Sequence, residues 1–282
     1  MKNIVFATDF SNEAYNALFY ITKLFEKKEC HFYLLNTYYL HKRRITNYTM
    51  ASEDLQEPLN PGDLSKAALL STLHRINLDV PNPKHSYDIV SEKGNLQETL
   101  KDLAARLKID LLVLGNGKKK GLTALLSGNQ VKESIEKVRN CPILIVPEAY
   151  EYSAPRHVAF ATDYKNYFHA RVLFPLLTLA GEWNSKVFTV HVKEKEDLSI
   201  RQKANMATLK KYMAHLNHSM YFMPKFSNKS KVIDTFIKEL DIDMLVMMHY
   251  EHGLFNRLIQ KPILEELCMS VEIPLLIIPC NN

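Results

Sequence analysis

Short apolar runs alternate with longer amphipathic segments along the whole 282-residue chain. In the first half the apolar runs stand at 3–8, 30–38, 85–92, 110–115 and 142–147. Between them, apolar residues recur at helical spacing, which predicts helices at 12–28, 64–77, 95–108 and 129–138. Strands that are apolar throughout are covered on both faces, as in parallel sheets joined by crossover helices. We therefore predict an α/β fold built from open, doubly wound, parallel five-stranded sheets.

The chain also repeats itself in three blocks that keep the same order. NIVFATDFSNEA returns as HVAFATDYKNYF, IDLLVLGN (109–116) returns as IDMLVMMH (242–249), and CPILIVP (141–147) returns as IPLLIIP (273–279). Such a repeat indicates two tandem copies of one domain. We expect the domains at 1–147 and 157–282, joined by a polar linker at 148–156. The first copy is longer because it carries an insertion around 41–66.

Composition and charge exclude some classes of function and leave the predicted fold as it is. The apolar fraction of 46% and the charged fraction of 24% are those of an ordinary globular protein. No apolar run approaches the roughly 20 residues that span a bilayer, and the first residues lack a signal-peptide pattern, so we expect a cytoplasmic protein without membrane association. The net charge of +5 is spread along the chain, without the motifs of a nucleic-acid-binding protein. Four cysteines without CxxC spacing predict free thiols.

Candidate chemistry lies where ligands bind in doubly wound sheets, at the carboxyl ends of the strands. The first copy places Asp9 after its first strand, Asn36 and Thr37 at the end of its second, and GNGKKKGLTALLSGN (115–129) after its fourth. This combination of an Asp, a glycine loop and a glycine before the last helix resembles the universal stress proteins, over essentially the whole chain. The resemblance implies a Rossmann-like fold of the adenine nucleotide alpha hydrolase type and a role in the stress response.

The resemblance also implies site residues. In nucleotide-binding members of that family the loop reads G-x2-G-x9-G-(S/T). Matched position by position, Asp9 takes the ribose position, Thr37 the adenine-contacting position on the second strand, Gly115 the first loop glycine and Gly128 the last. Glycines let backbone N–H groups approach phosphate closely, and the free N–H groups of a helix N-terminus favour anions.

Two positions depart from that pattern. The second loop glycine is Lys118 and the final Ser/Thr is Asn129, while Gly117 stands one place before Lys118. Asn129 is a good N-cap residue, and its amide can also donate to a phosphate. The Lys118 side chain crowds the loop, although its ammonium attracts phosphate. Two interpretations stay open: the first copy binds ATP with Mg²⁺, or its loop is degenerate on an intact fold.

The second copy has departed further. It keeps Asp163, but His249 and His252 were matched to the two early loop glycines, and Pro262 removes one N–H donor from the last helix. We therefore expect no nucleotide there. Asp163, His191, His249 and His252 are residue types that bind zinc or nickel, so a metal site is one hypothesis. The alternative is that these histidines pack or form hydrogen bonds in a cleft.

The function expected from these features is binding, not turnover. The chain has no GxSxG, HExxH or GxxxxGK[ST] motif, so at most weak ATP hydrolysis is expected. We expect a nucleotide-regulated protein with an unidentified protein partner. The alternatives are a nucleotide-free interaction scaffold and a metal-binding sensor in the second copy.

The last strand of each copy, PILIVP and PLLIIP, is apolar to its end. An uncovered edge of this kind associates readily, and fusing two copies makes the partner strand covalent. The sequence therefore predicts an intramolecular pseudo-dimer through the last strands, with an interface that includes Ile143, Ile145, Leu276 and Ile278. It leaves further homodimerisation open.

Overall fold

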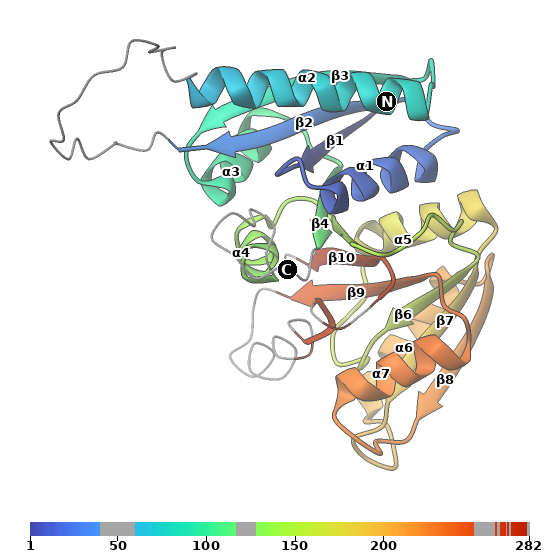
Figure 1. Ribbon diagram of the computed structural model, residues 1–282. Coiled ribbons are helices and arrows are strands. Elements are labelled where there is room, and N and C mark those ends of the chain that lie inside the picture. The colour runs from blue at the N-terminus through green and yellow to red at the C-terminus, as the bar shows by residue number, and fades with distance from the viewer. Residues whose placement is uncertain are drawn as a thin grey trace, which may run out of the picture.

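The computed structural model is a single ten-stranded sheet flanked by helices (Figure 1). It describes residues 1–39, 60–116, 128–250, 263, 266–268, 270 and 272–280, with the backbone alone at 128–132. Fold class is as the hydrophobic pattern predicts: strands and helices alternate, and every strand pairing inside each half is parallel.

In the first half, the observed elements lie within a few residues of the predicted ones. The strands are β1 (Lys2–Ala7), β2 (Cys30–Tyr38), β3 (His85–Lys93), β4 (Leu111–Asn116) and β5 (Ile143–Pro147), and the helices are α1 (Asn12–Leu24), α2 (Pro61–Asp79), α3 (Leu96–Arg106) and α4 (Gly128–Lys137). Helix α2 begins inside the stretch expected to be an insertion. Its Pro61 suits a first turn, and the side chain of Asn60 accepts from Gly62 N at 3.1 Å. Residues 40–59 of that stretch lie outside the described residues.

The second half repeats the pattern. Its strands are β6 (His157–Ala161), β7 (Lys186–Val192), β8 (Asn217–Met223), β9 (Met244–Tyr250) and β10 (Leu275–Cys280), and its labelled helices are α5 (Ala170–Trp183), α6 (Ile200–Tyr212) and α7 (Lys229–Glu239). Ser199 and Gln202 form a reciprocal capping box at the start of α6, and Asn228 accepts from Lys231 N at 2.9 Å at the start of α7. Local side-chain chemistry thus fixes where these helices begin.

The strand order shows where each half can receive a ligand. It runs β3-β2-β1-β4-β5-β10-β9-β6-β7-β8, so the second half mirrors the first. In both halves the order reverses beside the first strand, between β1 and β4 and between β6 and β9. Ligands of open α/β sheets bind outside the carboxyl ends of strands at such a switch point.

Helices cover both faces of the first half. Helices α1 and α2 contact each other on one face, while α3 and α4 contact each other on the opposite face. Consecutive residues of β1 are therefore buried on both sides, and Ile4, Val5 and Phe6 are all 0% exposed. This burial explains why the apolar residues of β1 are consecutive and do not alternate with polar ones.

The halves meet where β5 and β10 pair in antiparallel fashion. Leu275 pairs with Ile145, Leu276 with Leu144 and Ile277 with Ile143. Ile278, which is also expected in this interface, follows the last of these three pairs, and its partner on β9 is Met248.

The segment 148–156 lies along the same junction. Tyr150 accepts from Asn16 Nδ2 at its carbonyl (2.8 Å), and its hydroxyl donates to the Asp243 carbonyl at 3.1 Å. Lys28, in the turn that follows α1, forms an ion pair of 2.9 Å with Glu182 of α5. The segment is therefore held by both halves, unlike a free linker.

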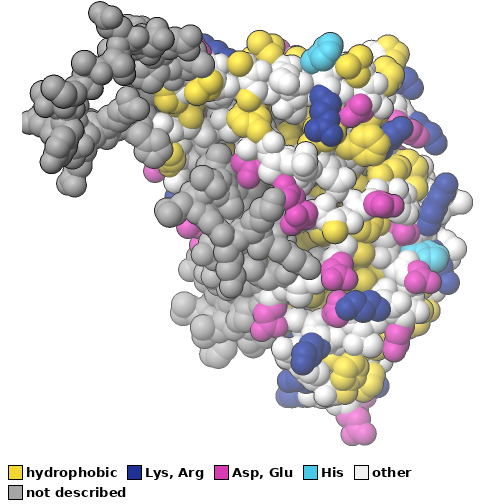
Figure 2. All heavy atoms as spheres, in the orientation of Figure 1, with side chains coloured by type: hydrophobic (Ala, Val, Ile, Leu, Met, Phe, Trp, Pro, Cys, Tyr) yellow, Lys and Arg dark blue, Asp and Glu magenta, His cyan; other side chains and the backbone are white. Residues whose placement is uncertain are grey.

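The surface and the thiols add two observations. Lys/Arg and Asp/Glu side chains are interspersed on the face shown in Figure 2, with no gathering of one sign over its described part. The four cysteines are buried thiols. Among the described residues, no helix has both the length and the apolar character needed to cross a membrane.

Candidate functional site

The first strand of the sheet ends in a tight turn that is built by its own side chains. Thr8 Oγ1 accepts from Phe10 N at 2.9 Å, and Asp9 Oδ1 accepts from Ser11 N at 3.0 Å. Phe10 has φ of +65°, a left-handed conformation that costs free energy in a bulky residue and needs such local support. The turn thereby places the Asp9 carboxylate at the switch point beside β4.

The two carboxylate oxygens of Asp9 differ in their contacts. Oδ1 also accepts from Ser11 Oγ at 2.5 Å, and Ser11 Oγ in turn accepts from Ala14 N at 3.1 Å as the N-cap of α1. Among the described residues, Oδ2 has no hydrogen-bond or ion-pair partner. One oxygen of Asp9 therefore holds the turn, and no described residue engages the other.

The end of β2 is held by a polar chain that the sequence did not reveal. Asn36 is 4% exposed; its Nδ2 donates to Thr8 O at 2.8 Å, and its Oδ1 accepts from Ser65 Oγ at 2.8 Å. Ser91 Oγ continues the chain to Ser65 Oγ at 2.8 Å. Thr37, the residue expected to contact adenine, follows Asn36 in β2 and is 3% exposed. These residues are far apart in the sequence and meet only in the folded chain, so no local sequence motif predicts their contacts.

Gly115 lies inside β4 and not in the loop that follows it. A Cβ built on Gly115 would stand 3.1 Å from Ala14 Cα and 3.2 Å from Glu13 O. The glycine is thus required for the close approach of α1 to β4, which is a packing role independent of any phosphate. Gly117 and Lys118 lie outside the described residues.

Helix α4 begins at Gly128, which agrees with the expected helix opening. Asn129 therefore falls within the first turn. The free N–H groups of this turn are the part of the loop that favours an anion.

The second half ends its first strand in the same turn. Thr162 Oγ1 accepts from Tyr164 N at 3.2 Å, Asp163 Oδ1 accepts from Lys165 N at 2.9 Å, and Tyr164 has φ of +56°. The repeated turn shows that the Thr-Asp pair has a conformational role in both halves, whatever each half binds.

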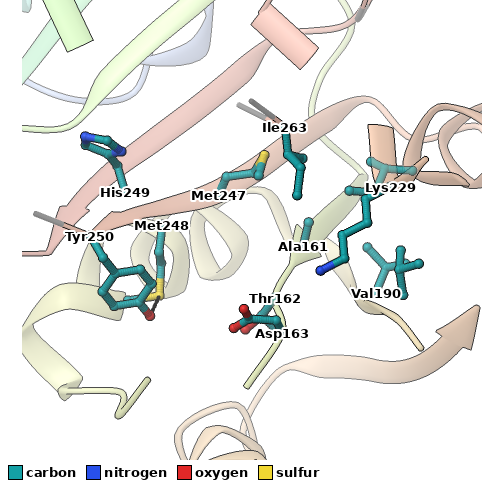
Figure 3. Close-up of a pocket in the computed structure, with 12 residues that line it drawn as sticks. Ala161, Thr162, Asp163, Val190, Lys229, Met247, Met248, His249, Tyr250 and Ile263 are labelled. Carbon is teal, nitrogen blue, oxygen red and sulfur yellow. Dashed lines mark hydrogen bonds between the residues drawn. The ribbon is translucent and has the colours of Figure 1, made fainter. Parts of the chain in front are cut away.

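A pocket of about 680 Å³, including its open mouth, lies at this end of the second half. Its wall is mostly apolar, from β6, β7, α7 and β9, and includes Val190, Val192, Ile233, Met247 and Met248. Figure 3 shows Lys229 extending past Ala161 toward the turn that carries Thr162 and Asp163.

Charges beside this pocket are already paired. Glu194 receives the ammonium of Lys229 at 2.6 Å and that of Lys165 at 2.9 Å, and Lys165 Nζ also lies 3.9 Å from Asp163 Oδ2. The hydrogen bond from Lys229, followed by that from Lys165, holds the pKa of Glu194 at about 2. Asp163 thus has a cation nearby, which Asp9 lacks among the described residues.

The histidines considered as metal ligands do not converge. His191 Nδ1 lies 3.0 Å from Thr162 O, the position held by Asn36 in the first half, and burial lowers the pKa of His191. Its ring packs between Tyr164 and Phe222. His249 projects from the opposite face of β9 to Met248, and Figure 3 shows it away from Asp163.

The described residues therefore contain no group of three His, Cys, Asp or Glu side chains placed to hold a metal ion. His252 lies outside the described residues.

The strand registers correct one match made from the sequence. Ala7 lies opposite Leu114 and Ala161 opposite Met247, so the counterpart of Gly115 is Met248 and not His249. Met248 is 8% exposed and lines the pocket. A large side chain therefore stands where the first half has none.

Comparisons with known proteins agree with this architecture. The family model described as "Universal stress protein family" matches residues 1–147. A universal stress protein from Archaeoglobus fulgidus DSM 4304 is similar to the chain over 98% of its length and 97% of that protein's, with a TM-score of 0.69 at 12% identity. A putative universal stress protein from Pseudomonas aeruginosa UCBPP-PA14 is similar over 99% and 93%, with a TM-score of 0.59 at 14% identity.

A third solved structure, the cytoplasmic domain of a prokaryotic cation chloride cotransporter, is similar over 98% of this chain and 94% of that one, with a TM-score of 0.53 at 9% identity. No curated protein matches the chain. At these identities the similarity to solved structures establishes the fold alone.

Proposed function

Because the chain belongs to the universal stress protein family, we propose that it acts in the stress response by binding an adenine nucleotide and a protein partner, without dedicated turnover. The nucleotide site is the switch point between β1 and β4 in the first half. The observation that carries the proposal is Asp9, whose Oδ1 is held by the turn while its Oδ2 has no partner among the described residues. A carboxylate held in this way is preorganised to accept hydrogen bonds from a ribose.

Two backbone features support the same site. Gly115 leaves the end of β4 without a side chain, and α4 opens at Gly128 after the next loop. The helix opening offers N–H donors and a favourable dipole for phosphate, with Mg²⁺ as the counterion of ATP. Asn36 and its hydroxyl partners hold the adjoining end of β2 in place.

We propose that the second half does not bind nucleotide. Met248 replaces the glycine, and Lys165 lies beside Asp163. The side chain narrows the site, and the ammonium competes for the carboxylate. We therefore expect one nucleotide per chain.

The domain division proposed is 1–147 and 157–282, with 148–156 between them. Mirrored strand orders, the repeated Thr-Asp turn and the β5–β10 pairing support two copies arranged as an intramolecular pseudo-dimer. In such an arrangement, nucleotide binding to one copy changes a surface to which a partner protein can bind while it also contacts the other copy.

Calorimetric titration of the full-length chain with Mg-ATP tests the site. We expect about one nucleotide per chain, and Asp9→Asn should weaken binding by about tenfold or more, because a hydrogen bond to a charged group contributes about 1.5–3 kcal/mol. Asp163→Asn is the matched control in the same turn of the other copy and should leave affinity unchanged.

Two results would contradict the assignment. Undetectable binding to the unmodified chain would favour a nucleotide-free interaction scaffold. Binding that depends on Asp163 and not on Asp9 would move the site to the second half. A parallel assay of phosphate release checks that ATP is bound and not consumed at a significant rate.

A further inference from the structure

Three polar side chains form a hydrogen-bonded line on strands β2 and β3, away from the switch point. Ser86 Oγ lies 2.7 Å from His31 Nδ1, and His31 Nε2 lies 3.0 Å from Asp88 Oδ2. Ser86 and Asp88 are two residues apart on β3, so their side chains share one face of the sheet, and His31 lies opposite Ser86 in the paired register. The imidazole therefore bridges a hydroxyl and a carboxylate.

The two contacts select one tautomer of a neutral imidazole. An ionised carboxylate only accepts, so the proton must be on Nε2 where the ring meets Asp88. The lone pair of Nδ1 then points at Ser86 and can accept its hydroxyl proton. This is the arrangement of a nucleophile, a general base and an orienting carboxylate, with the roles of the two ring nitrogens exchanged relative to the serine-protease triad.

The neighbouring side chains hold the base and leave the hydroxyl open. The His31 ring packs edge-on against Tyr33 at 4.6 Å between centroids, and the His31 side chain is only 16% exposed. Ser86 is exposed. An oriented base beneath an accessible hydroxyl is what attack on an external substrate requires.

An open hollow begins at Asp88, which lines it together with residues that follow in β3. Tyr33, Asp88, Leu103, Arg106 and Leu107 are among the residues that line it, and it encloses about 930 Å³ together with its open side. Its leucines and tyrosine offer an apolar surface for a small group, and Lys66, Glu92 and Arg106 add charged groups to its lining. Strand β3 is also the outer strand of the described sheet, so the N–H groups on its outer side have no strand to pair with there.

We propose that Ser86, His31 and Asp88 form an acyl-transfer site for small carboxylic esters with an apolar acyl group. The Ser86 oxygen bonds to the acyl carbon while His31 Nδ1 takes the hydroxyl proton. The ester C–O bond then breaks, and the departing oxygen receives that proton. Water, deprotonated by the same nitrogen, attacks the acyl-serine, releases the carboxylic acid and restores the hydroxyl. Asp88 acts as a positioning residue through His31.

The second half provides an internal comparison. Asn3 N donates to Asp110 and His157 N donates to Asp243, so Asn3 and His157 hold equivalent positions in the two halves. The residue opposite Asn3 in the next strand is His31, and the residue opposite His157 is Lys186. Lys186 lies opposite Asn217 on β8, so that half has neither the histidine nor the facing serine. The proposal is independent of nucleotide binding, because no residue of the switch point takes part.

The test uses the full-length chain with 4-nitrophenyl butyrate, following nitrophenolate release and the intact mass of the protein. We expect a butyryl adduct on the peptide that contains Ser86 and a release rate about 100-fold above that of Ser86→Ala, the lower range for general-base assistance. Ser219→Ala removes a serine from the opposite edge strand and should retain the full rate.

Asp88→Asn separates positioning from structure. The Asn amide can stabilise the other tautomer, which turns an N–H toward Ser86, so the acylation rate at saturating ester should fall by about tenfold or more while the unfolding midpoint stays within the range of surface variants. An unchanged release rate in Ser86→Ala, or acylation at a different residue, would overturn the proposal. So would an Asp88→Asn variant with the full acylation rate.

Discussion

Replacing Gly115 by alanine tests whether this glycine is required by packing. The added Cβ would lie 3.1 Å from Ala14 Cα and 3.2 Å from Glu13 O, both backbone atoms of α1. Carbon atoms in contact are normally about 3.5–4.0 Å apart, so the gap is short by roughly half an ångström. Because no rotatable side chain can yield, α1 must move as a unit, away from a strand against which it is closely packed.

The size of the effect follows from that displacement. Inserting a methyl into a well-packed site costs about 1–3 kcal/mol. The reduced flexibility of the unfolded chain offsets about 0.5–1 kcal/mol of this cost. The net destabilisation is therefore on the order of 1–2 kcal/mol, which corresponds to roughly 2–8 °C in Tm for a chain of this size class.

Thermal unfolding of Gly115→Ala beside Gly181→Ala provides the assay. Gly181 lies in α5, and no atom stands within 4 Å of a Cβ built on it, so alanine there should stabilise the chain by up to about 1 kcal/mol. The same chemical change should thus lower Tm at one site and raise it at the other. If Gly115→Ala matched or exceeded the unmodified chain in Tm, the packing explanation would be wrong.

Two further predictions concern charge and the junction. Glu194→Gln should cost about 1 kcal/mol at pH 7, after discounting for its exposure, because the mutation removes the pairing with Lys229 and Lys165. Since the folded pKa of Glu194 is lowered to about 2, this stability is present above pH 4.5 and is lost as pH falls toward 2, so urea unfolding of the two proteins should converge there. Tyr150→Phe removes the hydroxyl that donates to Asp243 O at 3.1 Å and should lower the urea midpoint by the equivalent of about 1 kcal/mol; an unchanged midpoint would show that this contact adds nothing to the junction.

Most of the fold follows from local pattern. Strand β2 was predicted at its observed bounds, and α3 and β5 within two residues, because a buried parallel strand leaves a short continuous apolar run and an amphipathic helix leaves a helical period. The insertion was the least predictable part, since α2 begins at Pro61, within the stretch 41–66 that was assigned to the insertion. Proline is acceptable both in a loop and in a first helical turn, so composition alone does not distinguish them.

The candidate site was less predictable because its decisive contacts are distant in sequence. Asp9 was proposed as a site residue, but the contact of its Oδ1 with Ser11, which leaves Oδ2 without a partner in the described part of the chain, depends on the geometry of the turn. The link from Asn36 to Ser65 joins residues 29 positions apart. Matching His249 to Gly115 placed the residues one position out of register, since the repeat of 109–116 at 242–249 and the strand pairing both set Met248 against Gly115.

The two copies together show which features of the switch point belong to the fold and which to binding. Both keep the Thr-Asp turn and its left-handed aromatic residue, so these features survive where the glycine has been replaced by Met248. The presence of Asp at this position is therefore weak evidence of nucleotide binding by itself. The stronger evidence is the difference between the copies, since only Asp163 has a nearby ammonium, from Lys165, among the described residues. A tandem chain supplies its own control in this way, because each copy shows what the fold retains when the other changes its chemistry.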